Sequence, residues 1–322
     1  MMAAFDARSP SVVAGAALVA FICAIAALSL LAAPPSGPVF WILVLVVLIG
    51  VAWTTMGLAS FEPANPLLCR ALQLLVPLVF GVALVLAWEF VVRGLQVPQV
   101  LLPAPSAIAA DIGRSIPMLW ADFVQTFVKA VVTGYVIGCG LGFLVAVLID
   151  RSPFLQRGLL PIGNLVSALP IVAVAPIMVM WFGFDWQSKA AVVVIVTFFP
   201  MLVNTVAGLA AAGRMERDLM HTYAASYGQA LVKLRLPAAL PFIFNALKIN
   251  STLALISAIV AEFFGTPIVG MGFRISAEIG RLNTSMVWAE ITVAALAGSL
   301  TYGLLSIAER LSTFWHPSYR DN

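Results

Sequence analysis

The chain has 322 residues, of which 62% are hydrophobic and 10% are charged, and its mean hydropathy is +1.06. Soluble globular domains contain about 45–50% apolar residues and about 25% charged residues, so this composition excludes a soluble globular protein and indicates an integral membrane protein. The net charge of +3 does not indicate nucleic-acid binding, because in a membrane protein the location of Lys and Arg matters more than their sum.

Cysteine and histidine patterns exclude the common metal and disulfide sites. The three cysteines, Cys23, Cys69 and Cys139, lie in or beside apolar segments and show no C-x-x-C spacing. The two histidines, His221 and His316, lie outside the apolar runs. We therefore expect inert buried thiols and no metal or haem centre within the membrane.

Long apolar runs account for most of the sequence. A helix needs about 20 largely apolar residues to cross about 30 Å of hydrocarbon. Eight stretches meet or approach this length, and we predict transmembrane helices near 11–33, 38–60, 71–93, 122–149, 158–182, 187–210, 242–266 and 285–308. The first run resembles a signal peptide, but its 23 residues exceed a normal signal-peptide core, which favours a retained helix.

Prolines and glycines modify this pattern at specific places. Residues 101–123 read as a proline-marked turn followed by a short helix at the outer interface, with Ser106 as its N-cap. The fifth run should be kinked or broken, because it contains Pro161, Pro170 and Pro176. In the fourth run, glycines at positions 134, 138 and 142 share one helical face and predict close helix packing.

The distribution of basic residues indicates an orientation. If the N-terminus is cytoplasmic, eight spans place the loops near 61–70, 150–157 and 211–241 and the C-terminus on the cytoplasmic side. That side then holds eleven of the seventeen Lys and Arg residues, as the positive-inside rule favours.

The stretch from Arg214 to Pro241 is the longest polar insert between the spans. Met215, Leu219, Tyr223, Tyr227 and Leu231 recur every four residues and would share one face of a helix. Such a helix suits a groove on a partner protein. Anionic lipid is an equally good partner for a basic amphipathic helix, so the spacing leaves both alternatives open.

Residues within this insert carry a family resemblance. Asp218 to Ala224, DLMHTYA, followed thirteen residues later by Pro237, resembles the EAA loop of bacterial ABC importer permeases. Asp218 stands for the Glu, Leu219 and Met220 for the two Ala, Ala224 for the Gly, and Leu236 with Pro237 for the distal L-P, so that four positions depart from the pattern.

Further stretches extend the resemblance to residues 71–320: WEFVVRGLQVPQVLLPAPSAI, LPIVAVAPIMVMWFG, ALKINSTLALISAIVAEFFG and TFWHPSYR. Together they are similar to the nitrate/sulfonate/taurine type of permease, a group that includes permeases for pyrimidine precursors and riboflavin. The resemblance implies an all-α polytopic membrane protein with a six-span type I importer core at 66–322. Residues 1–65 would add two accessory transmembrane helices.

The resemblance also implies how the chain is driven. The 214–232 segment would be a coupling helix that docks on a separate ATPase subunit. Met215, Leu219 and Tyr223 would fill the ATPase groove, Arg217 and Asp218 would make polar contacts at its rim, and Pro237 would fix the turn back into the membrane. Thr222 and Ala224 complete the expected coupling set.

Energy would come from another polypeptide. The chain has no G-x-x-x-x-G-K-[ST] motif, so we expect no enzymatic activity and no cofactor in it, and the partner ATPase would bind ATP and Mg. The expected partners are an ATPase dimer, an extracytoplasmic substrate-binding protein and a second permease copy. The expected location is the bacterial inner membrane, with both termini cytoplasmic.

Polar side chains within spans are candidates for the translocation pathway, because they are costly in hydrocarbon. The expected pathway residues are Asn204, Asn245, Asn250, Ser251 and Glu262. A hydrogen bond between helices is an equally good explanation for each Asn. We expect Glu89 and Lys129 to form structural ion pairs.

The preferred interpretation is the permease of an ATP-driven importer for a small polar solute, either a pyrimidine-like or vitamin-like heterocycle or a sulfonate- or nitrate-type anion. An ion-coupled secondary transporter is the alternative, although inverted repeats and ionisable residues at the bilayer midplane are not evident. An intramembrane hydrolase is not favoured, because no span contains His and the chain has no G-x-S-x-G.

Overall fold

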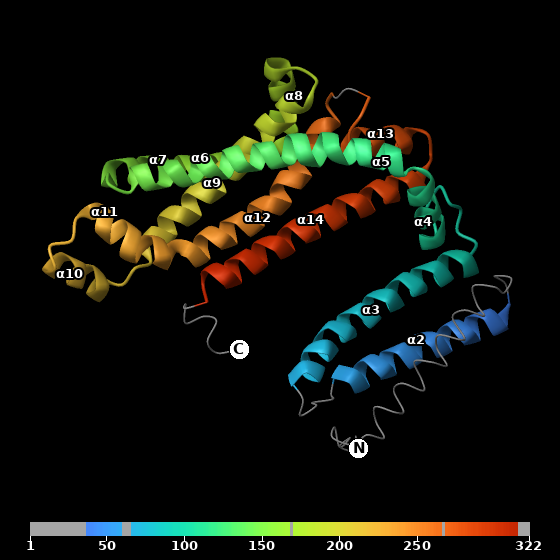
Figure 1. Ribbon diagram of the computed structural model, residues 1–322. Helices are drawn as coiled ribbons and strands as arrows, with labels where there is room; N and C mark the ends of the chain where they lie inside the picture. The colour runs from blue at the N-terminus through green and yellow to red at the C-terminus, as the bar shows by residue number, and fades with distance from the viewer. Residues whose placement is uncertain (1–36, 60–65, 168–169, 266–267, 315–322) are drawn as a thin grey trace. The chain divides into compact units, whose positions relative to one another are not determined.

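The computed structural model describes residues 37–59, 66–167, 170–265 and 268–314, and all regular structure in these ranges is helical (Figure 1). The elements are α2 Pro38–Ala59, α3 Pro66–Gly94, α4 Pro105–Arg114, α5 Ile116–Phe123, the π-helix η1 Val124–Val132, α6 Thr133–Ile149, α7 Pro153–Ser167, α8 Ile171–Phe182, α9 Trp186–Ala210, α10 Arg214–Thr222, α11 Tyr227–Ala230, the π-helix η2 Leu231–Arg235, α12 Leu236–Glu262, α13 Met271–Gly280 and α14 Thr284–Ser312.

Five described helical runs are long and apolar enough to cross a membrane: Leu75–Gly94, Ile116–Ile149, Trp186–Ala210, Tyr227–Glu262 and Thr284–Ser312. Two shorter apolar helices, Phe40–Met56 and Ile171–Phe182, fall within two further predicted spans. The structure therefore confirms an all-α polytopic fold. The predicted span at 11–33 lies outside the described residues.

The contacts divide the chain into two compact units. The first comprises the residues up to Gly113 together with Asn283–Ser285, and the second comprises Arg114–Leu282 and the residues from Met286. In the first unit, Phe40, Val44 and Val47 of α2 pack against Phe90 of α3. The expected core helix α3 thus shares its unit with the expected accessory helix α2.

Glu89 of α3, rather than Ser106, caps the start of α4. Its carboxylate accepts the Ser106 amide at 2.9 Å and the Ser106 hydroxyl at 2.7 Å. The predicted cap is therefore wrong, because the hydroxyl serves a carboxylate from another helix. The predicted ion pair of Glu89 is confirmed, with Arg93 at 2.5 Å.

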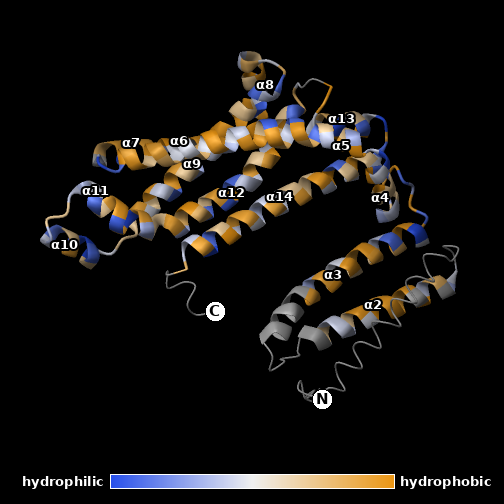
Figure 2. Ribbon diagram, viewed as in Figure 1, coloured by the Kyte–Doolittle hydropathy of each residue, from blue (hydrophilic) through white to orange (hydrophobic). Residues whose placement is uncertain are grey.

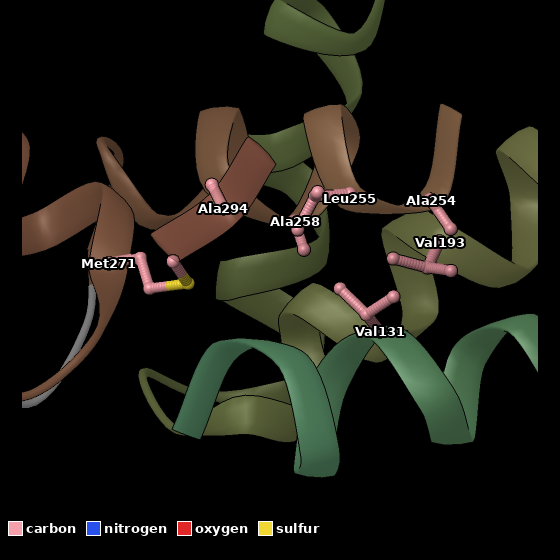
Figure 3. Packing of buried hydrophobic residues seen from close by; sticks show 7 residues of the cluster. All are labelled: Val131, Val193, Ala254, Leu255, Ala258, Met271 and Ala294. Carbon is pink, nitrogen blue, oxygen red and sulfur yellow. The ribbon is translucent and has the colours of Figure 1, made fainter. Parts of the chain in front are cut away.

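Helix α9 is the centre of the second unit, where it contacts η1, α6, α7, α8 and α12. A core of small and branched side chains joins η1, α9, α12, α13 and α14 through Val131, Val193, Ala254, Leu255, Ala258, Met271 and Ala294 (Figure 3). Figure 2 shows mostly hydrophobic residues along the long helices, and hydrophilic residues in α10 and at several helix ends.

Glycines on one face of α6 bring it against α9. A Cβ added at Gly134 would lie 2.6 Å from the Ala190 carbonyl oxygen, and one at Gly138 would lie 2.9 Å from the Val194 carbonyl oxygen. The same contact occurs at Gly142, 2.5 Å from the Phe198 carbonyl oxygen. The predicted packing face is confirmed, since each contact is closer than a side chain allows.

The predicted break in the fifth run is also confirmed. Helix α7 ends at Ser167, Pro170 is extended with ψ of 123°, and α8 begins at Ile171. Pro161 and Pro176 lie inside the two helices. Only the middle proline separates helical segments.

The glycine face gives a direct test. Gly138→Ala should lower the free energy of unfolding by about 1–3 kcal/mol, because its methyl group would push α6 away from α9. Gly140→Ala is the matched control, since a Cβ there meets nothing within 4 Å. Thermal unfolding of both variants in detergent measures the difference, and equal melting temperatures would contradict the packing described.

Candidate functional site

Helix α10 projects from the end of the second unit that also holds α11, while α5 and α13 lie at the opposite end (Figure 1). Met215, Leu219 and Tyr223 are 82%, 56% and 77% exposed, and their spacing places them on one side. Asp218 is also exposed, and the Thr222 hydroxyl donates to its backbone carbonyl at 2.9 Å. A row of large apolar side chains outside the spanning helices is a feature of interaction sites.

The predicted single helix over 214–232 is wrong, because the chain turns at Ala224. This residue has φ of +51°, the Ala224 amide donates to the His221 carbonyl at 2.9 Å, and the Ala225 amide donates to the Met220 carbonyl at 3.0 Å. These bonds form a Schellman motif, which ends a helix with a left-handed residue that is usually Gly. Ala224 is the position that the family pattern assigns to Gly.

A new helix begins immediately after the turn. Ser226 and Gln229 form a capping box, and the helical path then continues from Tyr227 to Glu262. Pro237 therefore lies within a helix, so the predicted turn at Pro237 is wrong. It follows the π-helical segment η2, whose wider turn suits a proline that has no amide to donate.

Two arginines tie this loop to the end of α9. Arg217 donates from Nε to the Ala212 carbonyl at 2.9 Å, and its Nη2 also binds the Ala210 carbonyl. Arg235 donates from Nε to the Leu209 carbonyl at 3.0 Å. The last carbonyls of a helix have no partner within the helix and carry partial negative charge, so both guanidinium groups stabilise this end.

Asp150, at the end of α6, accepts hydrogen bonds from the two Nη atoms of Arg235. Their two bonds measure 2.6 and 2.7 Å, and the Tyr227 hydroxyl donates to the same carboxylate at 2.6 Å. Arg151 lies 4.3 Å from the centre of the Tyr227 ring. Sequence reasoning missed Asp150 because it lies 85 positions from Arg235 and belongs to no motif.

Most of the expected pathway residues are occupied by structural hydrogen bonds. Buried Asn250 donates to the Thr197 carbonyl at 2.8 Å and joins α12 to α9. Ser251 donates to Lys248 and Asn204 donates to Pro200, both within their own helices. Asn245 differs, because its side chain is exposed on α12.

Glu262 is buried in a polar cluster at the opposite end of the second unit. It accepts the Thr126 hydroxyl at 2.7 Å and the Gly272 amide at 2.6 Å. In the same cluster, Asp122 accepts the Gly270 amide at 2.6 Å and pairs with Arg274 at 2.9 Å. Glu262 is 3% exposed, and its carboxylate holds the start of α13.

The expected ion pair of Lys129 is not found among the described residues. Lys129 donates to Gln125 at 3.0 Å, and Gln125 donates to Asp185 at 2.7 Å. Asp185 lies between α8 and α9, where the bond from Gln125 and another from the Trp186 amide lower its pKa.

The left-handed turn can be tested by replacing Ala224 with Gly. The left-handed conformation costs an L-residue about 1–2 kcal/mol, so Ala224→Gly should stabilise the turn by about 1 kcal/mol. Hydrogen exchange of the Ala225 amide should then slow about fivefold. Ala230→Gly is the control, since Ala230 is helical with φ of −64° and should lose stability instead. Faster exchange in Ala224→Gly would contradict this assignment.

Comparison with known proteins gives the family. Residues 138–314 match the family described as binding-protein-dependent transport system inner membrane component. The formylaminopyrimidine transport permease protein ThiX of Halalkalibacterium halodurans is 30% identical over 76% of this chain and 98% of its own length. The riboflavin transport system permease protein RibX of Chloroflexus aurantiacus is 28% identical (73% and 88%), and the putative aliphatic sulfonates transport permease protein SsuC of Bacillus subtilis is 29% identical (75% and 88%). The chain therefore belongs to the family of inner membrane components of binding-protein-dependent ABC transport systems.

Proposed function

We propose that this permease works with a separate ATPase subunit, and that the ATPase docks on the face of α10 formed by Met215, Leu219 and Tyr223. The single observation that carries this proposal is the exposure of these three side chains on one short helix outside the spans. Apolar anchors four residues apart on a helix suit a groove on a partner protein.

Charge favours a protein partner over anionic lipid. The nine residues of α10 contain Arg214 and Arg217 but also Glu216 and Asp218, so their formal charges cancel. The Arg217 guanidinium is also engaged by the carbonyls at the end of α9. Helices that rest on anionic membranes carry an excess of Lys and Arg on the polar face, which α10 lacks.

Within this proposal, the coupling residues have different roles. Met215, Leu219 and Tyr223 are the anchors, while exposed Asp218 and Thr222 border them. Ala224 sets the angle at which α10 leaves the membrane helix, and Arg217 positions α10 against α9. Pro237 lies farther along the spanning helix, so we do not include it among the proposed anchors.

The α10 loop and both termini would face the cytoplasm, where ATP is available. Eleven of seventeen basic residues lie on that side in this orientation. The partner ATPase would bind ATP and Mg, since the chain has no P-loop sequence. A binding protein would deliver the solute from the other side of the inner membrane.

The pathway would run beside the exposed side of α12, completed by a second copy of the chain. Asn245 is exposed there, and a polar amide side chain is costly against lipid. The names of the relatives include a formylaminopyrimidine, riboflavin and aliphatic sulfonates, so a small polar heterocycle or a sulfonate-type anion is the proposed solute.

Replacing one anchor tests the docking face. Leu219→Asp should weaken ATPase binding by about 2 kcal/mol or more, or about 30-fold, because it places a charge at the centre of an apolar contact. The measurement is the amount of P-loop ATPase that co-purifies with the tagged chain from its native membrane.

Leu282→Asp is the matched control, because Leu282 is 64% exposed and lies after α13, in a turn whose left-handed conformation Asp tolerates. It should retain the ATPase. Full retention in Leu219→Asp, with normal membrane insertion, would exclude this face. Asp218→Lys should also weaken binding, since it reverses a charge beside the anchors.

The role of the first two helices can be tested by removing residues 1–65. We expect the shortened chain to assemble with the ATPase, because α10 and all its described hydrogen-bond partners lie in the second unit. Loss of α2 would uncover Phe90, which can face lipid. If the shortened chain folds but does not bind the ATPase, residues 1–65 are needed for assembly of the complex.

A further inference from the structure

We propose that Asp150 is the positioning residue that passes movement of α10 to the membrane helix α6 and fixes the point about which α12 bends. The inference rests on the proposed docking of an ATPase on α10. It assigns a role in the transport cycle to a residue that touches neither the docking face nor the exposed side of α12.

Three spanning helices meet at the Asp150–Arg235 pair. Asp150 ends α6, Arg235 belongs to the helix that continues into α12, and the same guanidinium binds the Leu209 carbonyl of α9. The Asp150 side chain is 2% exposed. Besides the two bonds from Arg235, its carboxylate accepts one from Tyr227, at the first position of α11, and a longer one from Gln156 at 3.5 Å. A bidentate Arg–carboxylate pair fixes orientation as well as distance.

The connection from α10 to this pair is short and hydrogen-bonded throughout. The Schellman motif at Ala224 joins the end of α10 to the capping box at Ser226, and Tyr227 follows directly. At its other end, α10 is tied to α9 through Arg217. A displacement of α10 therefore reaches Asp150 without passing through an unbonded segment.

The π-helical segment η2 provides a place where the spanning helix can bend. It covers Leu231–Arg235 and ends at the residue that binds Asp150. Wide π turns often occur at functional sites, and they are among the places where helices kink. Movement held at Asp150 would thus change the direction of α12 beyond Arg235.

A second pair in the same unit offers a matched comparison for a purely stabilising role. Arg274 pairs with Asp122 at the opposite end of the unit, and the side chains are 14% and 0% exposed, against 16% and 2% for Arg235 and Asp150. Arg235→Ala and Arg274→Ala each leave one buried Asp without its Arg, so both should lower the melting temperature. Only Arg235→Ala should release the start of the α12 helix from α6 and α9, and so remove the fixed point about which movement of α10 turns α12.

The experiment uses the full chain with its co-purifying ATPase, in lipid nanodiscs, in a background without Cys23 and Cys69. Thr252→Cys places a thiol on the exposed side of α12, and Cys139 is buried. The labelling rate with a maleimide is measured without nucleotide and with ATP plus vanadate.

The parental complex should give two different labelling rates, and Arg274→Ala should keep this difference. Arg235→Ala should bind the ATPase but give equal rates under the two conditions. Arg235→Lys should restore part of the difference, because it keeps one charged bond.

Other outcomes would overturn the assignment. A retained difference in Arg235→Ala would show that Asp150 does not carry the movement, and equal rates in both Arg variants would show that general loosening causes the loss. Equal labelling rates in the parental complex would mean that α12 does not move when the ATPase binds nucleotide, which would also overturn the proposal. If folded Arg235→Ala fails to bind the ATPase, the pair builds the docking surface instead. Absence of an ATPase from the parental chain would instead refute the proposed function, and with it this inference.

Discussion

The bond between Asp150 and Arg235 holds the α9–α12 loop in place, and the exposed helix α10 depends on it. The carboxylate receives both arms of the guanidinium at 2.6 and 2.7 Å, and it is almost completely buried. Leaving one member of such a pair alone costs about 3–5 kcal/mol, so the two groups must stay together. Arg235 also binds the Leu209 carbonyl, so its pairing with Asp150 joins the spanning helices α6, α9 and α12.

The helices α6, α9 and α12, which this pair joins, are closely packed. Gly134, Gly138 and Gly142 let α6 approach the backbone of α9, and Asn250 fixes α12 to the same helix. At the opposite end, Asp122 and Glu262 hold the first residues of α13. Close-packed interiors transmit displacement rather than absorbing it, which makes the loop a suitable place to move the whole unit.

Features that depend on neighbouring residues in the chain could be predicted from the sequence. Span length follows from apolar runs, and the glycine face follows from a spacing of four. A break in the fifth run follows from its three prolines, but the sequence does not show that it lies at Pro170. The spacing of four also placed Met215, Leu219 and Tyr223 on one side of a helix, and the structure leaves all three exposed.

Features that depend on contacts between residues far apart in the sequence could not be predicted in this way. Tyr227 and Leu231 continue the spacing of the anchors but lie beyond a turn formed by an alanine, a residue with high helix propensity. Asn250 and Glu262 are costly in a membrane whether they bind a solute or a neighbouring helix, and only the structure shows their hydrogen bonds. Asp150 carries no local pattern, since its partner lies on a distant helix.

The protein is a permease whose short helix α10, with formal charges that cancel, presents apolar side chains from a loop held by hydrogen bonds. An electron cryo-microscopy structure of the chain purified from its native membrane with its bound partners tests this most directly. The predicted result is a P-loop ATPase whose groove covers Met215, Leu219 and Tyr223, with Arg235 still bound to Asp150 beneath α10. An ATPase held by other elements while α10 remains uncovered would contradict it.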